Sequence, residues 1–231
     1  MSHKLIKKPE AILFDLDGTL ADTIVQLAKA ASASALELGI TPPDIETTKN
    51  YVGNGVNLLL TRVLLGRFDV SVKDIASEDL KRARSVFDKV YTKGLSQDFK
   101  LYAGVKEGIS YFHSLGIKLA VVTNKPQIFA VPLIEHMGLS SYFDYILGGE
   151  VLEKKKPDPE PILHVLDKLS VKAENAVMVG DSINDTLAAS NAGVPCVFLT
   201  YGYNRANPQE LIFDYSFDSF ELFTDFIKKL D

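Results

Sequence analysis

The stretch that decides the fold is residues 11–20, AILFDLDGTL, in which four apolar residues lead directly into Asp15 and then Asp17. A continuous apolar run without alternation is typical of a strand that is covered on both faces, as in a parallel sheet. Buried carboxylates are costly unless they are paired, hydrogen-bonded or bound to a metal. Two acids at the end of such a strand therefore either lie at a surface edge by chance or mark a place where something is bound.

Apolar runs of the same kind recur along the chain. They are KLAVVTN (118–124), DYILGG (144–149), NAVMVGD (175–181) and PCVFLT (195–200). Segments with helical spacing lie between them, and several end at a glycine, at 105–115, 126–137, 160–169 and 184–192. This alternation predicts an α/β fold with a doubly wound, mainly parallel, Rossmann-like sheet.

The segment that follows the first strand breaks this alternation. Between about residues 22 and 90, apolar residues recur at helical spacing, and no convincing strand is present. We expect an inserted all-helical cap domain over 21–90 and a catalytic core made of 1–20 and 91–231. A final amphipathic helix is expected at 220–230.

The composition excludes several classes of protein. The chain has 231 residues, is 46% hydrophobic, and carries a net charge of −5, which argues against a nucleic-acid binder. No apolar run approaches the roughly 18 residues that span a membrane, and the start of the chain is interpreted as a first strand rather than a signal peptide. The single cysteine, Cys196, lies in an apolar setting and is expected to be a buried core thiol. We expect a cytoplasmic protein, with monomer and homodimer both open.

In parallel α/β sheets, ligands bind beyond the carboxyl ends of the strands. The predicted strand ends and the loops after them carry Asp15, Asp17, Thr123, Asn124, Lys125, Lys156, Asp181 and Asp185. Gathered carboxylates repel one another, by about 1 kcal/mol per pair at 4 Å in water and about 4 kcal/mol at an effective dielectric near 20. A hard divalent cation would remove this conflict, and oxygen donors without nearby histidine or cysteine favour Mg²⁺ over zinc.

Mg²⁺ with lysine and threonine donors describes a phosphate site, although the chain has no G-x-x-x-x-G-K-[ST] loop. We expect Asp15 to attack phosphorus and form an aspartyl-phosphate. Asp17 would protonate the leaving oxygen and then deprotonate the attacking water. Thr123 would donate to a phosphoryl oxygen, and Lys156 would offset its charge.

The other candidate residues support this chemistry. Gly18 would let the backbone turn tightly and approach the phosphate. Thr19 and Asn124 are further candidates for binding phosphate or substrate. Asp181 would hold Mg²⁺, and Asp185 would orient waters or Lys156, with Ser182 in support.

Four stretches resemble, in order, the motifs of the haloacid dehalogenase (HAD) superfamily. They are DLDGTL (15–20), VVTNK (121–125), KKPDPEP (155–161) and GDSIND (180–185). The resemblance covers the whole chain, and the helical segment lies where the superfamily inserts its C1 cap. It implies the same residue roles, and it adds the backbone carbonyl of Asp17 as a second Mg²⁺ ligand from the protein.

Three further segments resemble bacterial phosphoglycolate phosphatases, namely YVGNGVNLLLTRVL (51–64), residues 101–126 and LTYGYN (199–204). This resemblance implies hydrolysis of 2-phosphoglycolate to glycolate and phosphate. The VGNG segment would be a specificity loop with Asn54 pointing inward, or a flexible turn. Arg62 is the candidate cation for the substrate carboxylate, or an exposed helix arginine. Tyr201 and Tyr203 could equally be packing residues.

Several alternatives stay open or are disfavoured. A HAD phosphatase for another small phosphate ester and a β-phosphoglucomutase-like phosphotransferase share the motifs and the cap type. Haloacid dehalogenases themselves lack an aspartate corresponding to Asp17, and phosphonatases use a cap lysine whose position the sequence does not identify here. A two-component receiver domain also uses acids, threonine, lysine and Mg²⁺, but it is about half this length and lacks a counterpart of Asp17. The expected partner is a small phosphorylated metabolite, with no nucleic acid or membrane.

Overall fold

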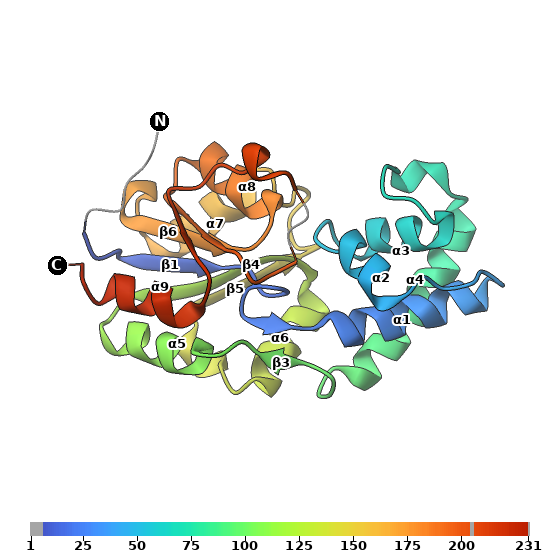
Figure 1. Cartoon of the computed structure of the whole chain (residues 1–231), viewed down its shortest axis with the longest axis horizontal. Helices are drawn as coiled ribbons and strands as arrows, with labels where there is room; N and C mark the ends of the chain where they lie inside the picture. Colours follow the sequence, from blue (N-terminus) through green and yellow to red (C-terminus); the bar gives the residue numbers. More distant parts are fainter. Residues whose placement is uncertain (1–6, 204–205, 231) are drawn as a thin grey trace. The chain divides into compact units, whose positions relative to one another are not determined.

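The computed structural model describes residues 7–203 and 206–230, and its chain contacts form two compact units. The first unit comprises the chain up to Asp22 and from Leu101 onward, and the second is Thr23–Lys100. Figure 1 follows the chain through both. Each unit is described by itself.

The first unit is built on a six-stranded sheet with the order β5-β4-β1-β6-β7-β8. Its strands are β1 (Ala11–Phe14), β4 (Lys118–Pro126), β5 (Tyr145–Gly149), β6 (Ala176–Gly180), β7 (Cys196–Leu199) and β8 (Tyr215–Phe217). All of the pairings are parallel, and Ala11 of β1 is opposite Lys118 on one side and Ala176 on the other. The chain runs outward from β1 to β5 and then returns to β6, so the strand order reverses beside β1. The predicted doubly wound α/β fold is confirmed.

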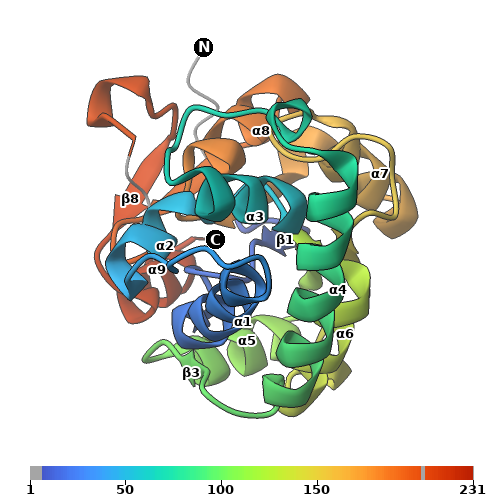
Figure 2. The ribbon, with the colours of Figure 1, turned by 90° about the vertical axis from the view of Figure 1, so that its right-hand side faces the viewer.

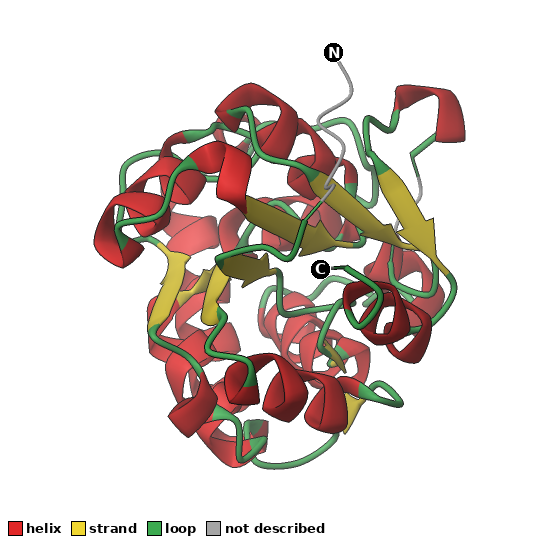
Figure 3. Cartoon of the chain, turned by 90° about the vertical axis from the view of Figure 1, so that its left-hand side faces the viewer, coloured by secondary structure: helices red, strands yellow, loops and turns green. Residues whose placement is uncertain are grey.

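Helices cover both faces of this sheet, as Figure 3 shows with helices in red and strands in yellow. They are α5 (Val105–Ser114), α6 (Gln127–His136), α7 (Glu160–Leu169), α8 (Ile183–Ala192) and α9 (Phe220–Ile227). Alternate residues of β1 face opposite sides. Leu13 joins a cluster that includes residues of α7 and α8, while the Phe14 ring lies 6.5 Å from Phe112 of α5 and 5.9 Å from Phe220 of α9. Burial on both faces explains why the run 11–14 is apolar without alternation.

Two short strands lie where the chain passes from one unit to the other. Two-residue strands, β2 (Ala21–Asp22) and β3 (Lys100–Leu101), pair with one another. Cys196 is buried, as expected. Within the described parts of the chain, none of the helices is both long enough and apolar enough to cross a membrane.

The second unit is helical, with α1 (Ile24–Glu37), α2 (Ile45–Tyr51), α3 (Val56–Leu65) and α4 (Ser77–Gly94). Figure 2 shows these four helices. Buried hydrogen bonds join α1 to α4: the Tyr91 hydroxyl donates to Gln26 Oε1 at 3.0 Å, and Ser34 Oγ donates to the Ala83 carbonyl at 2.9 Å. Small residues such as Ala30 and Ala83 are fully buried there, which allows the two helices to approach closely.

Candidate active site

The carboxyl ends of β1, β4 and β6 bring the predicted polar residues together, because these strands are neighbours in the sheet. Asp15 follows β1 directly, and its backbone N–H donates to the Val179 carbonyl at 3.0 Å, which extends the ladder by one residue. Asp181 follows β6. Asp15, Asp181 and Asp185 each offer one carboxylate oxygen, and these oxygens all lie within 4.8 Å of one another.

Lys156 supplies positive charge to this group of acids. Its side chain is buried, and its Nζ lies 3.1 Å from Asp15 Oδ1 and donates to Asp185 Oδ1 at 2.6 Å and to the Val122 carbonyl at 2.5 Å. Burial alone would lower the pKa of Lys156, but the charges of Asp15 and Asp185 outweigh it and hold the pKa above its ordinary value. The ammonium group is therefore charged at neutral pH.

The Asp185 carboxylate accepts hydrogen bonds from Lys156 and Ser182. While Oδ1 accepts from Lys156, Oδ2 accepts from the Ser182 backbone N–H at 3.0 Å and from Ser182 Oγ at 2.6 Å. The bond from the Ser182 backbone N–H is one half of the capping box that starts α8; in the other half, the Ser182 side chain accepts from the Asp185 backbone N–H. Both oxygens of Asp185 thus have protein donors, and one of them holds the Lys156 ammonium group in place beside Asp15.

Asp15 carries an unsatisfied buried oxygen. Oδ1 is buried without a hydrogen-bond partner, because Lys156 Nζ at 3.1 Å is close enough for an ion pair but is not aligned for a hydrogen bond. Burial raises the pKa of Asp15 to about 6; the charge of Asp185 adds to this, and Lys156 opposes it. Burial and the two neighbouring carboxylates likewise raise the pKa of Asp181. The site holds more negative charge than Lys156 balances, and a divalent cation would correct this.

Asp181 is held by the turn that follows β1. Thr19 Oγ1 donates to Asp181 Oδ1 at 2.6 Å, and both side chains are buried. Gly18 has a φ of +87°, and a Cβ at this position would lie 2.4 Å from Asp181 Oδ2. Both the conformation and the space therefore require glycine here. Glycine at position 18 therefore lets the turn pass directly against the Asp181 carboxylate.

Asp17 forms an ion pair with Lys125, a residue that the sequence places at the end of a strand but to which our predictions gave no role. Lys125 Nζ donates to Asp17 Oδ1 at 2.9 Å and to Oδ2 at 3.0 Å. The two side chains are only 2% and 12% exposed. The sequence feature that could have indicated this pair is Lys125 itself, which is the last residue of the stretch VVTNK (121–125) on β4. The two residues before it are also engaged: the Thr123 hydroxyl accepts from the Lys125 N–H at 3.2 Å, and Asn124 Nδ2 donates to the Lys156 carbonyl at 2.8 Å.

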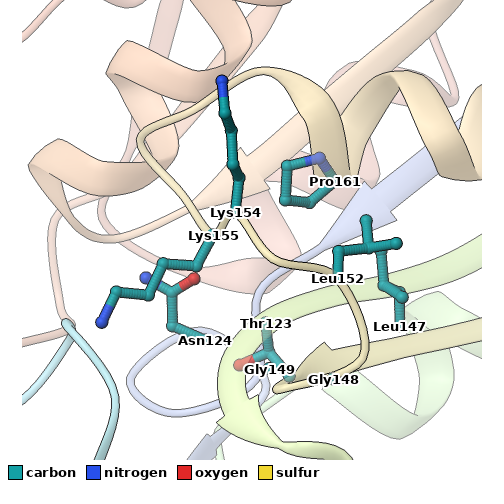
Figure 4. Close-up of a pocket in the computed structure, with 9 residues that line it drawn as sticks. All are labelled: Thr123, Asn124, Leu147, Gly148, Gly149, Leu152, Lys154, Lys155 and Pro161. Carbon is teal, nitrogen blue, oxygen red and sulfur yellow. The ribbon is translucent and has the colours of Figure 1, made fainter.

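A small pocket opens beside Thr123 and Asn124. It is lined by Thr123, Asn124, Leu147, Gly148, Gly149, Leu152, Lys154, Lys155 and Pro161. In Figure 4, Lys155 extends alongside Asn124, whereas Lys154 points away from it. Lys154 pairs instead with Asp158 at 3.0 Å. The pocket joins the predicted phosphate-binding residues to a loop that is rich in lysine.

Asn54 and Arg62 lie together in the helical unit. Arg62 is only 5% exposed, so the alternative of an exposed helix arginine is wrong. Its Nη1 donates to Asn54 Oδ1 at 2.9 Å and to the Tyr51 carbonyl at 2.8 Å, and its Nε donates to the Phe68 carbonyl at 3.1 Å. The guanidinium also lies 4.1 Å from the centre of the Phe68 ring. Arg62 thus ties the loop before α3 to the segment after it.

Comparisons with known proteins agree with this geometry. The family model described as haloacid dehalogenase-like hydrolase matches residues 12–199. The chain is 39% identical over 226 residues to a phosphoglycolate phosphatase of Psychrobacter arcticus, covering 95% of this chain and 96% of that protein. It is 41% identical over 199 residues to a phosphoglycolate phosphatase of Thiobacillus denitrificans, covering 86% of each.

Among solved structures, the crystal structure of a predicted phosphoglycolate phosphatase from Haemophilus somnus superposes with a TM-score of 0.86 at 31% identity, covering 97% of this chain and 99% of that one. The resemblance of the four motifs to the HAD superfamily is therefore confirmed. The chain belongs to the haloacid dehalogenase-like hydrolases.

Proposed function

We propose that this hydrolase is a Mg²⁺-dependent phosphomonoesterase that works through an aspartyl-phosphate and that hydrolyses 2-phosphoglycolate. The observation that carries the reaction class is Asp15, whose buried oxygen has no hydrogen-bond donor and lies beside Lys156 at the point where the strand order reverses. The substrate is supported by the two relatives that are named phosphoglycolate phosphatase and match nearly the whole chain. In this proposal, Thr23–Lys100 acts as the cap of the catalytic core.

The donor set at the sheet edge fits Mg²⁺. Asp15 and Asp181 would supply carboxylate oxygens and Asp17 its backbone carbonyl, and the acidic cluster of the described residues contains no imidazole or thiolate. Hard oxygen donors in small number suit Mg²⁺, which keeps several waters and shares substrate oxygens. When bound, the ion would neutralise the excess charge and polarise the phosphoryl oxygens.

In the first step, a carboxylate oxygen of Asp15 attacks phosphorus. The bond between Asp15 and phosphorus forms, the bond from phosphorus to the ester oxygen breaks, and Asp17 gives its proton to the leaving glycolate oxygen. Lys156 offsets the negative charge next to Asp15, and the Thr123 hydroxyl donates to a phosphoryl oxygen. Lys125 fixes the direction in which the Asp17 carboxyl points.

In the second step, Asp17 takes a proton from a water molecule, and the water oxygen attacks the aspartyl-phosphate. The bond between Asp15 and phosphorus breaks, which releases inorganic phosphate and regenerates both carboxyl groups. Gly18 and Thr19 would leave their backbone close to the phosphate, while Asp185 and Ser182 hold Lys156 in place. One acid therefore serves both half-reactions.

The cap residues are assigned a different role from the one expected for Arg62. Because Arg62 already donates to three acceptors of its own unit, we infer that it positions the loop of Asn54 rather than binding the substrate carboxylate. Asn54 remains the proposed specificity residue of that loop. A cytoplasmic location and a monomeric or homodimeric state also remain predictions.

The test is a substrate profile. Purified protein with Mg²⁺ is assayed for phosphate release from 2-phosphoglycolate and from a panel of other small phosphomonoesters. We expect kcat/KM for 2-phosphoglycolate to exceed that of the others by about 10-fold or more, the scale of discrimination that a few contacts provide. Equal values would refute the substrate but keep the phosphatase class, and a mutase would release little phosphate. Asp15→Asn should abolish turnover because an amide is a poor nucleophile, and retained activity would refute the aspartyl-phosphate.

A further inference from the structure

The loop that follows β7, residues 200–203, lies against Asp181. The Tyr203 backbone N–H donates to Asp181 Oδ2 at 2.6 Å, while Thr19 donates to Oδ1 on the opposite side. Asp181 is almost fully buried, so these two donors decide the direction of its carboxyl plane. One of the donors belongs to a loop that lies outside the four HAD motifs and has no role in the proposed mechanism.

Gly202 makes this approach possible. A Cβ on Gly202 would lie 2.2 Å from both Cβ and Oδ2 of Asp181, which is far inside van der Waals contact. Asp181 is fixed at the end of β6, so the clash could be relieved only by moving the loop away. Glycine is therefore required at position 202 because there is no space for a side chain. The close approach that glycine allows brings the Tyr203 backbone N–H within hydrogen-bonding distance of the Asp181 carboxylate.

Two tyrosine hydroxyls fasten the same loop to the turn after β1. The Tyr201 hydroxyl donates to the Thr19 carbonyl at 2.8 Å, and the Tyr203 hydroxyl donates to Asp22 Oδ1 at 2.5 Å. The Tyr102 ring packs against Tyr201 with a centroid distance of 4.4 Å. Burial and the bond to Asp22 raise the pKa of Tyr203 far above its ordinary value, so its hydroxyl keeps the donated proton.

We propose that Tyr201, Gly202 and Tyr203 form a tyrosine clamp that sets the position of Asp181 relative to the turn after β1 and thereby the affinity of the site for Mg²⁺. Tyr201 and Tyr203 are positioning residues, since they act through Asp181 and Thr19. The proposal rests on the proposed function only in taking Asp181 as a metal ligand. Outer partners of this kind typically change metal affinity about 10–100-fold when they are altered.

The test is isothermal titration of MgCl₂ into the metal-free, full-length protein without substrate. Tyr203→Phe removes one hydroxyl and keeps the ring, and we expect the Kd for Mg²⁺ to rise about 10-fold, the lower end of the effect of outer partners. Tyr201→Phe should raise it in the same direction. Tyr145→Phe is the matched control, because it removes a hydroxyl contact with His164 at 3.3 Å, outside the proposed site, and it should leave the Kd unchanged.

The outcomes separate a clamp from ordinary packing. If Tyr203→Phe and Tyr201→Phe lower the melting temperature as Tyr145→Phe does but keep the Kd of the unaltered protein, the clamp is refuted. If the unaltered protein binds no Mg²⁺, both the metal site and the clamp are wrong. If the protein hydrolyses another ester in preference to 2-phosphoglycolate, and Tyr203→Phe still raises the Kd for Mg²⁺, the proposed substrate is refuted and the clamp is supported.

Discussion

The buried ion pair between Lys125 and Asp17 gives a quantitative test of the site's electrostatics. Coulomb's law gives an attraction of about 6 kcal/mol for charges 2.9 Å apart at an effective dielectric near 20. Desolvation of two side chains that are 2% and 12% exposed offsets much of this. We expect a net coupling free energy of about 2–3 kcal/mol, and a larger loss when only one partner is removed, because the other charge is left buried.

A double-mutant cycle measures this coupling. Lys125→Met, Asp17→Asn and the double variant are compared with the unaltered protein by urea unfolding, followed by circular dichroism. The control cycle uses Lys228→Met and Asp225→Asn, a pair with the same 2.9 Å separation whose side chains are 48% and 56% exposed. We expect no measurable coupling for this exposed pair. Equal coupling in both cycles would refute the argument that burial, rather than distance, gives the site pair its strength.

Two further predictions concern the stability of the metal-free fold, and a third concerns Mg²⁺ binding. The pKa of Asp15 is about 6 in the folded protein against 3.8 when unfolded, so ionisation of Asp15 opposes folding. Relative to Asp15→Asn, the unaltered protein should therefore lose about 2 kcal/mol of stability as the pH rises from 4 to 7. Thermal melts across this range check the sign, and a pH-independent difference would contradict it. Arg62→Met should cost about 2 kcal/mol because it removes the Arg62 donor from the buried Tyr51 carbonyl. Arg82→Met, which breaks a half-exposed contact with Glu37 at 3.6 Å, should cost little, and equal losses in urea unfolding would contradict this. Gly18→Ala should abolish Mg²⁺ binding because its Cβ meets Asp181 at 2.4 Å, and calorimetric binding like that of the unaltered protein would contradict this.

The sheet and its site-bearing strand ends could be predicted because their signals are local. The apolar run 11–14 and the acids after it appear together in the sequence, and parallel strands bring their carboxyl ends to one edge. Other elements lack such a signal. The helix α2, IETTKNY, has no apolar stripe, and its readable mark was the N-cap Asp44, which accepts from the Thr47 N–H at 2.7 Å. The strand β8 has three residues, of which none is fully buried.

Side-chain pairing was harder to predict than position. The predictions gave the countercharge of the site to Lys156 and did not use Lys125, because a strand pattern does not say which carboxylate a lysine reaches. Arg62 was treated as a cation for the substrate or an exposed residue, since helical spacing alone does not reveal that Tyr51 and Phe68 fold around it. Such partners are fixed by loops whose paths depend on contacts between distant segments, and local sequence does not encode these contacts.

The central place of β1 in the sheet has a consequence for how the protein is made. This strand is synthesised before the two strands that pair with it. Its partners for Ala11 are Lys118 and Ala176, so β1 has no strand to pair with until these later segments have been made. At a translation rate of roughly 5–20 residues per second, the delay before β4 exists is on the order of 5–20 seconds. During that interval the helical unit, whose contacts are internal to Thr23–Lys100, can already form on the nascent chain. The edge of β1 stays unpaired meanwhile, so we expect chains stalled before residue 176 to need a chaperone and to bind no metal.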